Sequence, residues 1–63
     1  MTRKARAFIL RLYDKRSPLG TADDDLHAYL VAAGYCYSTP DGRLLMLTRD
    51  GKDYAREQRR AAA

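Results

Sequence analysis

Apolar side chains recur at helical spacing near the start of the chain. They occupy positions i, i+3, i+4 and i+7, and they are Ala5, Phe8, Ile9 and Leu12. This pattern places them on one side of a helix. It predicts a first helix over about residues 3–16. The Ser17-Pro18 pair is expected to end it, because proline disfavours helical geometry in the residue before it.

A second helical pattern follows, with apolar positions at Ala22, Leu26, Tyr29, Leu30 and Ala33. Thr21 is its predicted N-cap, with Asp24 three residues later as in a capping box, and Gly34 is its predicted C-cap. Three consecutive aspartates, residues 23–25, fall in the first turn, where the helix dipole favours negative charge. Consecutive helical residues point about 100° apart. Capping therefore explains these aspartates better than a metal site.

Two β-prone runs flank a Pro40-Asp41-Gly42 turn. Pro40 presets the φ angle of a type I turn and Gly42 can adopt the left-handed conformation, which predicts a bulged three-residue hairpin loop. In that register Tyr37 faces Leu45 and Tyr35 faces Leu47, and these four side chains pack on the helices. A slip of one residue would exchange the two faces.

Thr48 is the predicted N-cap of a last helix that runs from Arg49 to about Arg60, with Tyr54 and Ala55 as its apolar positions. The predicted fold class is therefore α+β: two helices, a two-stranded antiparallel hairpin and a C-terminal helix. A chain of 63 residues forms one small domain, 1–63, with 58–63 as a frayed tail. The predicted core consists of Phe8, Ile9, Leu12, Leu26, Leu30, Leu47 and Tyr54.

The net charge of +4 is unevenly distributed along the chain. Residues 1–19 carry six basic side chains and one acidic, residues 20–41 carry four aspartates and no cation, and residues 42–63 carry six basic side chains and three acidic. An excess of cations favours polyanionic ligands. The candidate nucleic-acid contacts are Lys4, Arg11 and Lys15 on the first helix, Arg43 in the hairpin, and Lys52 and Arg56 on the last helix.

Catalytic and metal chemistry find little support in the composition. The chain has one cysteine, Cys36, and one histidine, His27, so a disulfide, a Cys-x-x-Cys zinc site and an acid–base or nucleophilic set are not expected. The prediction is a protein that is not an enzyme and needs no cofactor. An apolar signal segment and a run of roughly 20 apolar residues are both missing, so we expect a cytoplasmic protein without membrane contact.

Three motifs follow one another between residues 26 and 54. A helix ends in Leu30-x-x-x-Gly34-Tyr35, a turn follows at Asp41-Gly42-Arg43, and Leu47-Thr48-x-x-Gly51 opens the last helix. This succession resembles the C-terminal half of winged helix-turn-helix domains. The resemblance implies a small winged-helix-like DNA-binding protein, an accessory factor in transcription regulation of the kind carried by phages and mobile elements.

By position, the second helix corresponds to the recognition helix of that family. Its first turn carries three carboxylates that repel phosphates, and it offers no arginine or asparagine to contact a base. We therefore expect DNA contacts through the first helix, the wing and the last helix, with little sequence specificity. The alternative is a protein–protein interaction module, a homodimer or an inhibitor of a host factor. Its binding residues would be Asp24, Asp25, Ala28 and Val31.

The arrangement of charge in space can distinguish these two functions. A continuous positive band that joins the first helix, Arg43 and the last helix would favour DNA. Separate basic patches around an acidic face with exposed apolar residues would favour a protein partner.

Overall fold

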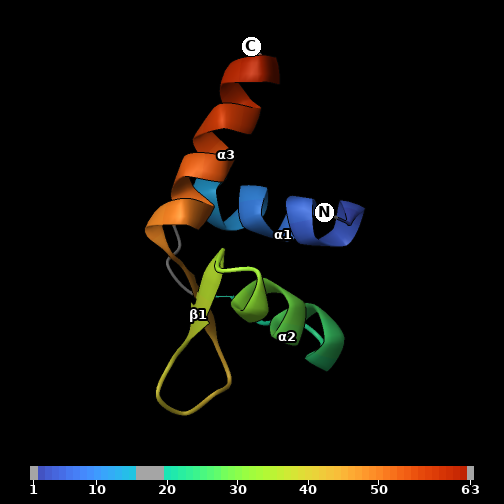
Figure 1. Ribbon diagram of the computed structural model, residues 1–63, viewed down its shortest axis with the longest axis vertical. Helices are drawn as coiled ribbons and strands as arrows, with labels where there is room; N and C mark the ends of the chain where they lie inside the picture. The colour runs from blue at the N-terminus through green and yellow to red at the C-terminus, as the bar shows by residue number, and fades with distance from the viewer. Residues whose placement is uncertain (1, 16–19, 63) are drawn as a thin grey trace.

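The computed structural model describes residues 2–15 and 20–62; residues 1, 16–19 and 63 lie outside that description, and so does the predicted break at Ser17-Pro18. Within the described residues the order is α1 (Arg3–Asp14), α2 (Asp24–Ala32), β1 (Cys36–Ser38), β2 (Leu45–Leu47) and α3 (Arg49–Ala62) (Figure 1). The α+β fold class is therefore confirmed. α1 and α3 cross at one end of a molecule of 36 × 21 × 16 Å, and α2 and the hairpin form the other end.

The apolar positions of α1 all turn inward, as predicted: Ala5, Phe8, Ile9 and Leu12 are buried. The helix begins after Thr2, whose side-chain Oγ1 accepts a hydrogen bond from the Ala5 N–H at 3.2 Å. Lys15 is its C-cap. Because a hydroxyl satisfies one of the free N–H groups at the first turn, the start of α1 is well defined.

The N-cap of α2 is Asp23, so the prediction of Thr21 is wrong. The Asp23 carboxylate Oδ1 accepts from the Leu26 N–H at 2.8 Å, and Asp is at least as good an N-cap as Thr. The C-terminal end agrees with the glycine signal: Gly34 has φ +85°, and the N–H of Tyr35 donates to the Leu30 carbonyl at 3.1 Å. This six-to-one hydrogen bond is the Schellman arrangement that ends a helix at a left-handed glycine.

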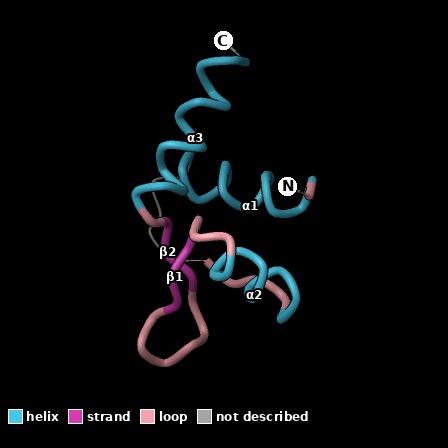
Figure 2. The backbone as a smooth tube through the Cα atoms, viewed as in Figure 1, coloured by secondary structure: helices cyan, strands magenta, loops and turns pink. Residues whose placement is uncertain are grey.

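The hairpin differs from the prediction by one residue. β1 pairs with β2 so that Tyr37 lies opposite Met46 and Ser38 opposite Leu45. The N–H of Thr39 donates to the Leu44 carbonyl at 2.9 Å, so the loop contains four residues, 40–43, rather than three. Asp41 explains the extra residue, because its side chain accepts from the Arg43 N–H at 3.1 Å and so holds Arg43 within the loop. Figure 2 shows this loop projecting away from the helices.

This one-residue difference in register reverses which side of β1 faces the core. β2 presents the predicted side to the core. Cys36 is 2% exposed and joins the core, whereas Tyr37, predicted to pack on the helices, is 47% exposed. Gly20 pairs with the other edge of β2, with two hydrogen bonds to Leu45 of 3.0 and 2.8 Å. A Cβ atom on Gly20 would lie 2.7 Å from Leu12 Cδ2, so glycine allows this extended segment to pass close to α1.

Thr48 connects the end of α2 to the start of α3. Its N–H donates to the Tyr35 carbonyl at 3.0 Å, its hydroxyl donates to the Gly34 carbonyl at 2.6 Å, and the same Oγ1 accepts from the Gly51 N–H at 3.1 Å. A Cβ atom on Gly51 would lie 2.1 Å from the Tyr35 carbonyl oxygen. The Thr-x-x-Gly motif therefore caps α3 and lets its first turn approach the chain directly after α2.

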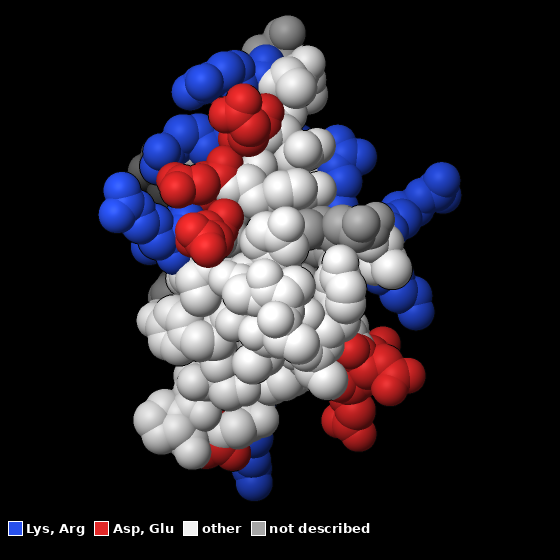
Figure 3. Space-filling view, in the orientation of Figure 1, with Lys and Arg blue, Asp and Glu red and all other residues white. Residues whose placement is uncertain are grey.

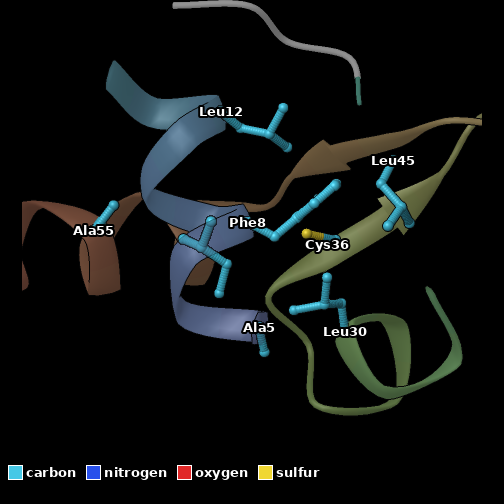
Figure 4. Close-up of a cluster of buried hydrophobic side chains, with 8 residues drawn as sticks. Ala5, Phe8, Leu12, Leu30, Cys36, Leu45 and Ala55 are labelled. Atoms are coloured by element: carbon cyan, nitrogen blue, oxygen red, sulfur yellow. The ribbon is translucent and has the colours of Figure 1, made fainter. Parts of the chain in front are cut away.

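The core lies between α1, α2 and the hairpin, with Ala55 joining from α3. Figure 4 shows Phe8 of α1 directed toward Cys36 and Leu45 of the hairpin. Of the predicted core residues, Phe8, Ile9, Leu12 and Leu30 are buried, and Leu26, Leu47 and Tyr54 are half-buried at its edge. The full buried set is Ala5, Phe8, Ile9, Leu12, Leu30, Cys36, Leu45 and Ala55.

Candidate binding surfaces

The cations of the described residues gather on the two helices that cross. α1 with its C-cap Lys15, together with α3, forms what we call the cationic half; it holds ten Lys and Arg against four acidic side chains, a net charge of +6. Residues 20–48 hold four aspartates and Arg43, a net charge of −3. Figure 3 shows the basic groups over α1 and α3 and a largely uncharged area below them.

Two polar contacts join α1 to α3 within the cationic half. The Arg59 guanidinium donates twice to the Asp14 carboxylate, with Nε 3.0 Å from Oδ1, and this hydrogen bonding raises the pKa of Arg59 above its ordinary value. Arg6 Nε donates to Gln58 Oε1 at 3.1 Å. Contacts as exposed as these add little to stability. They connect α1 to α3 where the two helices cross.

Five of the six predicted nucleic-acid contacts lie on the cationic half, and all six are exposed. Arg56 is 3.5 Å from Asp53 on the same helix. Arg43 lies apart from the others, in the hairpin loop at the opposite end of the long axis from the C-terminal end of α3 (Figure 1). The structure therefore places Lys4, Arg11, Lys15, Lys52 and Arg56 on two crossing helices. It does not join Arg43 to them, so the continuous band that would favour DNA is only partly present.

A shallow groove of about 410 Å³ separates the start of α1 from the start of α2. Arg3 and Lys4 form one lip, and Asp23 and Asp25 form the other; Leu26 and Tyr29 also line the groove, and Arg11 borders its continuation along α1. The opposed charges weaken the positive potential of α1 at this end. The side of the cationic half that faces away from α2 is therefore the more favourable side for a polyanion.

The predicted protein-binding residues all lie on the exposed surface of α2: Asp24, Asp25, Ala28 and Val31. Most of this helix is apolar, and Ala32 and Ala33 are exposed beside them. Among the described residues, the large apolar side chains that are most exposed are Tyr29, Val31 and Tyr37, at 38, 41 and 47% exposure. All three come from α2 and β1, so these exposed apolar side chains lie outside the cationic half.

A hollow of about 490 Å³ lies between the end of α2 and one side of α3, and sequence reasoning did not predict it. Ala33, Tyr35 and Tyr54 form its apolar part, and the two tyrosine rings are 5.3 Å apart with their planes at 51°. Its acidic part consists of Asp50, Asp53 and Glu57. Their i, i+3, i+7 spacing is visible in the sequence, but their position next to α2 depends on the docking of α3.

The remaining reactive side chains are engaged in the fold. His27 Nε2 is 2.5 Å from Ser38 Oγ, which joins α2 to β1. Burial raises the pKa of the Cys36 thiol to about 11. Nowhere among residues 2–15 and 20–62 do three His, Cys, Asp or Glu side chains gather in a way that could hold a metal ion. The helices of this described part are each too short or too polar to cross a membrane.

Comparison with protein-family models, with curated proteins and with solved structures gives no match for this chain.

Proposed function

We propose that this protein binds nucleic acid through the cationic half, as a small accessory or regulatory factor with weak sequence specificity. The observation that carries the proposal is the separation of charge: a net charge of +6 on α1, Lys15 and α3 against −3 on residues 20–48. A polyanion is attracted to the first region and repelled by the second. The resemblance of residues 26–54 to winged-helix domains supports the same proposal.

Phosphate contacts are the mode of binding that these side chains favour. Lys and Arg that neutralise phosphates release condensed counterions, and this gives an affinity that falls steeply with salt and depends little on sequence. α2 lacks the Arg, Asn and Gln side chains that usually contact base edges. Binding would therefore position the protein along a duplex without selecting a site.

Fluorescence anisotropy on a labelled random-sequence duplex, measured between roughly 50 and 200 mM salt, tests this proposal. Lys52→Gln should weaken binding to all sequences alike and lower the slope of log affinity against log salt by about one. Arg43→Gln is the matched control, because it removes the same charge from the hairpin loop outside the cationic half. Equal effects of the two substitutions, or no binding of the parent protein at roughly 50 mM salt, would refute the proposal.

A protein–protein interaction module is a second candidate function, and it uses a different surface. The observation that favours it is the exposed apolar side of α2, where Ala28, Val31 and Ala32 lie at i, i+3 and i+4, because exposed apolar patches are characteristic of interaction sites. The two functions are compatible, since α2 and β1 lie outside the cationic half.

A further inference from the structure

The outward side of α2 is an uncharged helix surface that no other described element covers. Ala28, Val31 and Ala32 are exposed on it, and the chain carries no Lys or Arg between residues 20 and 42. A surface helix of a small domain usually presents charged and polar side chains to solvent. We call Ala28, Val31, Ala32 and Ala33 the docking face.

Acidic side chains stand at both ends of the docking face. Asp24 and Asp25 occupy its N-terminal end, in the first turn of α2. At the other end, Ala33 borders the hollow that contains Asp50, Asp53 and Glu57 of α3. Figure 3 shows acidic groups on either side of an uncharged area.

Part of this negative charge is already balanced within the protein. Asp53 and Glu57 lie 3.5 and 3.6 Å from Arg56 and Arg60, in pairs whose side chains are more than half exposed. Arg3 and Lys4 face Asp25 across the groove, but the salt bridges among the described residues include none of the three α2 aspartates. Exposed pairs of this kind are weak, so the carboxylates remain available to a partner.

We infer that the docking face binds a helical segment of a protein partner that has an apolar stripe and Lys or Arg at both ends. The apolar stripe matches Ala28, Val31 and Ala32, and the two basic ends match the two acidic ends. An arginine at the α3 end can also lie against the Tyr35 and Tyr54 rings, which attract cations through their π faces. This inference rests on the second candidate function and is independent of nucleic-acid binding.

The length of the docking face sets the length of the partner segment. α2 has nine residues, and at a rise of 1.5 Å per residue it is about 14 Å long. A partner helix that covers it and reaches both acidic ends needs about four turns, or roughly 15 residues.

A second copy of this chain fits the docking face less well. Two docking faces brought together would place acidic ends near acidic ends or against an uncharged surface, and like charges across an interface oppose binding. The same carboxylates repel nucleic-acid phosphates. A basic, helical protein segment is therefore the occupant that the charges favour.

The test uses two labelled helical peptides of about 16 residues with the same leucine stripe. One peptide has Lys at both ends, the other has Glu. The Lys-ended peptide should bind the full protein at least about tenfold more tightly by fluorescence anisotropy. In amide NMR spectra it should shift resonances of α2 and of the start of α3. Tighter binding of the Glu-ended peptide, or shifts confined to α1, would overturn the inference while leaving another protein-binding mode open.

Substitutions in the protein then test which acidic side chains contribute to peptide binding. D24N/D25N and D50N/D53N should each weaken Lys-ended peptide binding severalfold, whereas D41N is the matched control because asparagine keeps the side-chain oxygen that the loop uses. Circular dichroism confirms that each variant is folded. Two outcomes would refute both the inference and the use of this face for a different protein partner. One is that neither peptide binds; the other is that sedimentation shows a dimer and the NMR spectra show that α2 is buried in it.

Discussion

At Gly51, helix propensity favours alanine, whereas packing favours glycine. Glycine inside a helix usually costs about 0.5–1 kcal/mol relative to alanine. Here a Cβ atom would lie 2.1 Å from the Tyr35 carbonyl oxygen, so α3 can approach the end of α2 only because residue 51 has no side chain. The glycine of the Leu-Thr-x-x-Gly motif is therefore explained by contact rather than by flexibility.

Gly51→Ala should destabilise the fold by about 1–3 kcal/mol, because the added methyl group forces α3 away from Tyr35 and strains the Thr48 hydrogen bonds. Urea unfolding followed by circular dichroism measures the change. Ala61→Gly, at an exposed position of the same helix, reports helix propensity alone. If Gly51→Ala raised the stability, propensity would outweigh packing at this site.

Cys36 should be unreactive in the folded protein. The residue is 2% exposed, and burial raises the pKa of its thiol from 9.0 to about 11, so very little thiolate forms at pH 8. A thiol reagent should label the unfolded protein in urea much faster than the native one. Because the unfolded thiol ionises first, Cys36 should also make stability fall as pH rises from 9.0 toward about 11. A Cys36→Ala variant that lost stability equally over that range would contradict this.

The helices and strands were predictable where their signals are local. The apolar stripe of α1 predicts its buried side correctly, because only one orientation of the helix turns all four apolar residues toward the core. The N-cap of α2 was misplaced, because Thr21 and Asp23 both match the local pattern. The register of the hairpin was missed by one residue, since it depends on the side-chain hydrogen bonds of Asp41 and on the pairing of Gly20 with Leu45, which is distant in sequence.

Leu30 and Val31 should differ sharply in their contribution to the stability of α2. Leu30 is fully buried, whereas Val31, which points about 100° away around the helix, is 41% exposed. Leu30→Ala should cost about 2–5 kcal/mol, and Val31→Ala should change stability by less than about 0.5 kcal/mol. Denaturant unfolding measures the free energy of unfolding of both variants. If Leu30→Ala does not fold, Leu30→Met is used in its place. Similar losses at both positions would contradict the observed packing of α2.

At the scale of the whole molecule, the sequence predicts basic and acidic segments but not how they meet. Residues 1–19 and 42–63 are both basic in sequence, yet only the crossing of α1 and α3 unites them. Asp14 and Arg59, which join these helices, are 45 residues apart and carry no local signal. The hollow beside Ala33 was missed for the same reason, because it combines residues from α2 and α3.

Removing the negative charge of α2 should therefore affect two ligands in opposite directions. D24N/D25N raises the net charge by two, so binding of random duplex should strengthen modestly at roughly 50 mM salt and change less at roughly 200 mM, where screening is stronger. The same variant should weaken binding of the Lys-ended peptide. Parallel anisotropy titrations with both ligands measure this. Changes in the same direction for both would mean that the two surfaces are not separate.

Thr48 also bears on how well the hairpin loop tolerates insertions. Its hydrogen bonds to Gly34 and Tyr35 close the hairpin at its base, while residues 40–43 project from the opposite end. Loop-closure entropy grows only slowly with length, so extra residues at the tip should leave both helices where they are. The loop is thus a permissive place to attach a fluorophore or an affinity tag, away from both the cationic half and the docking face.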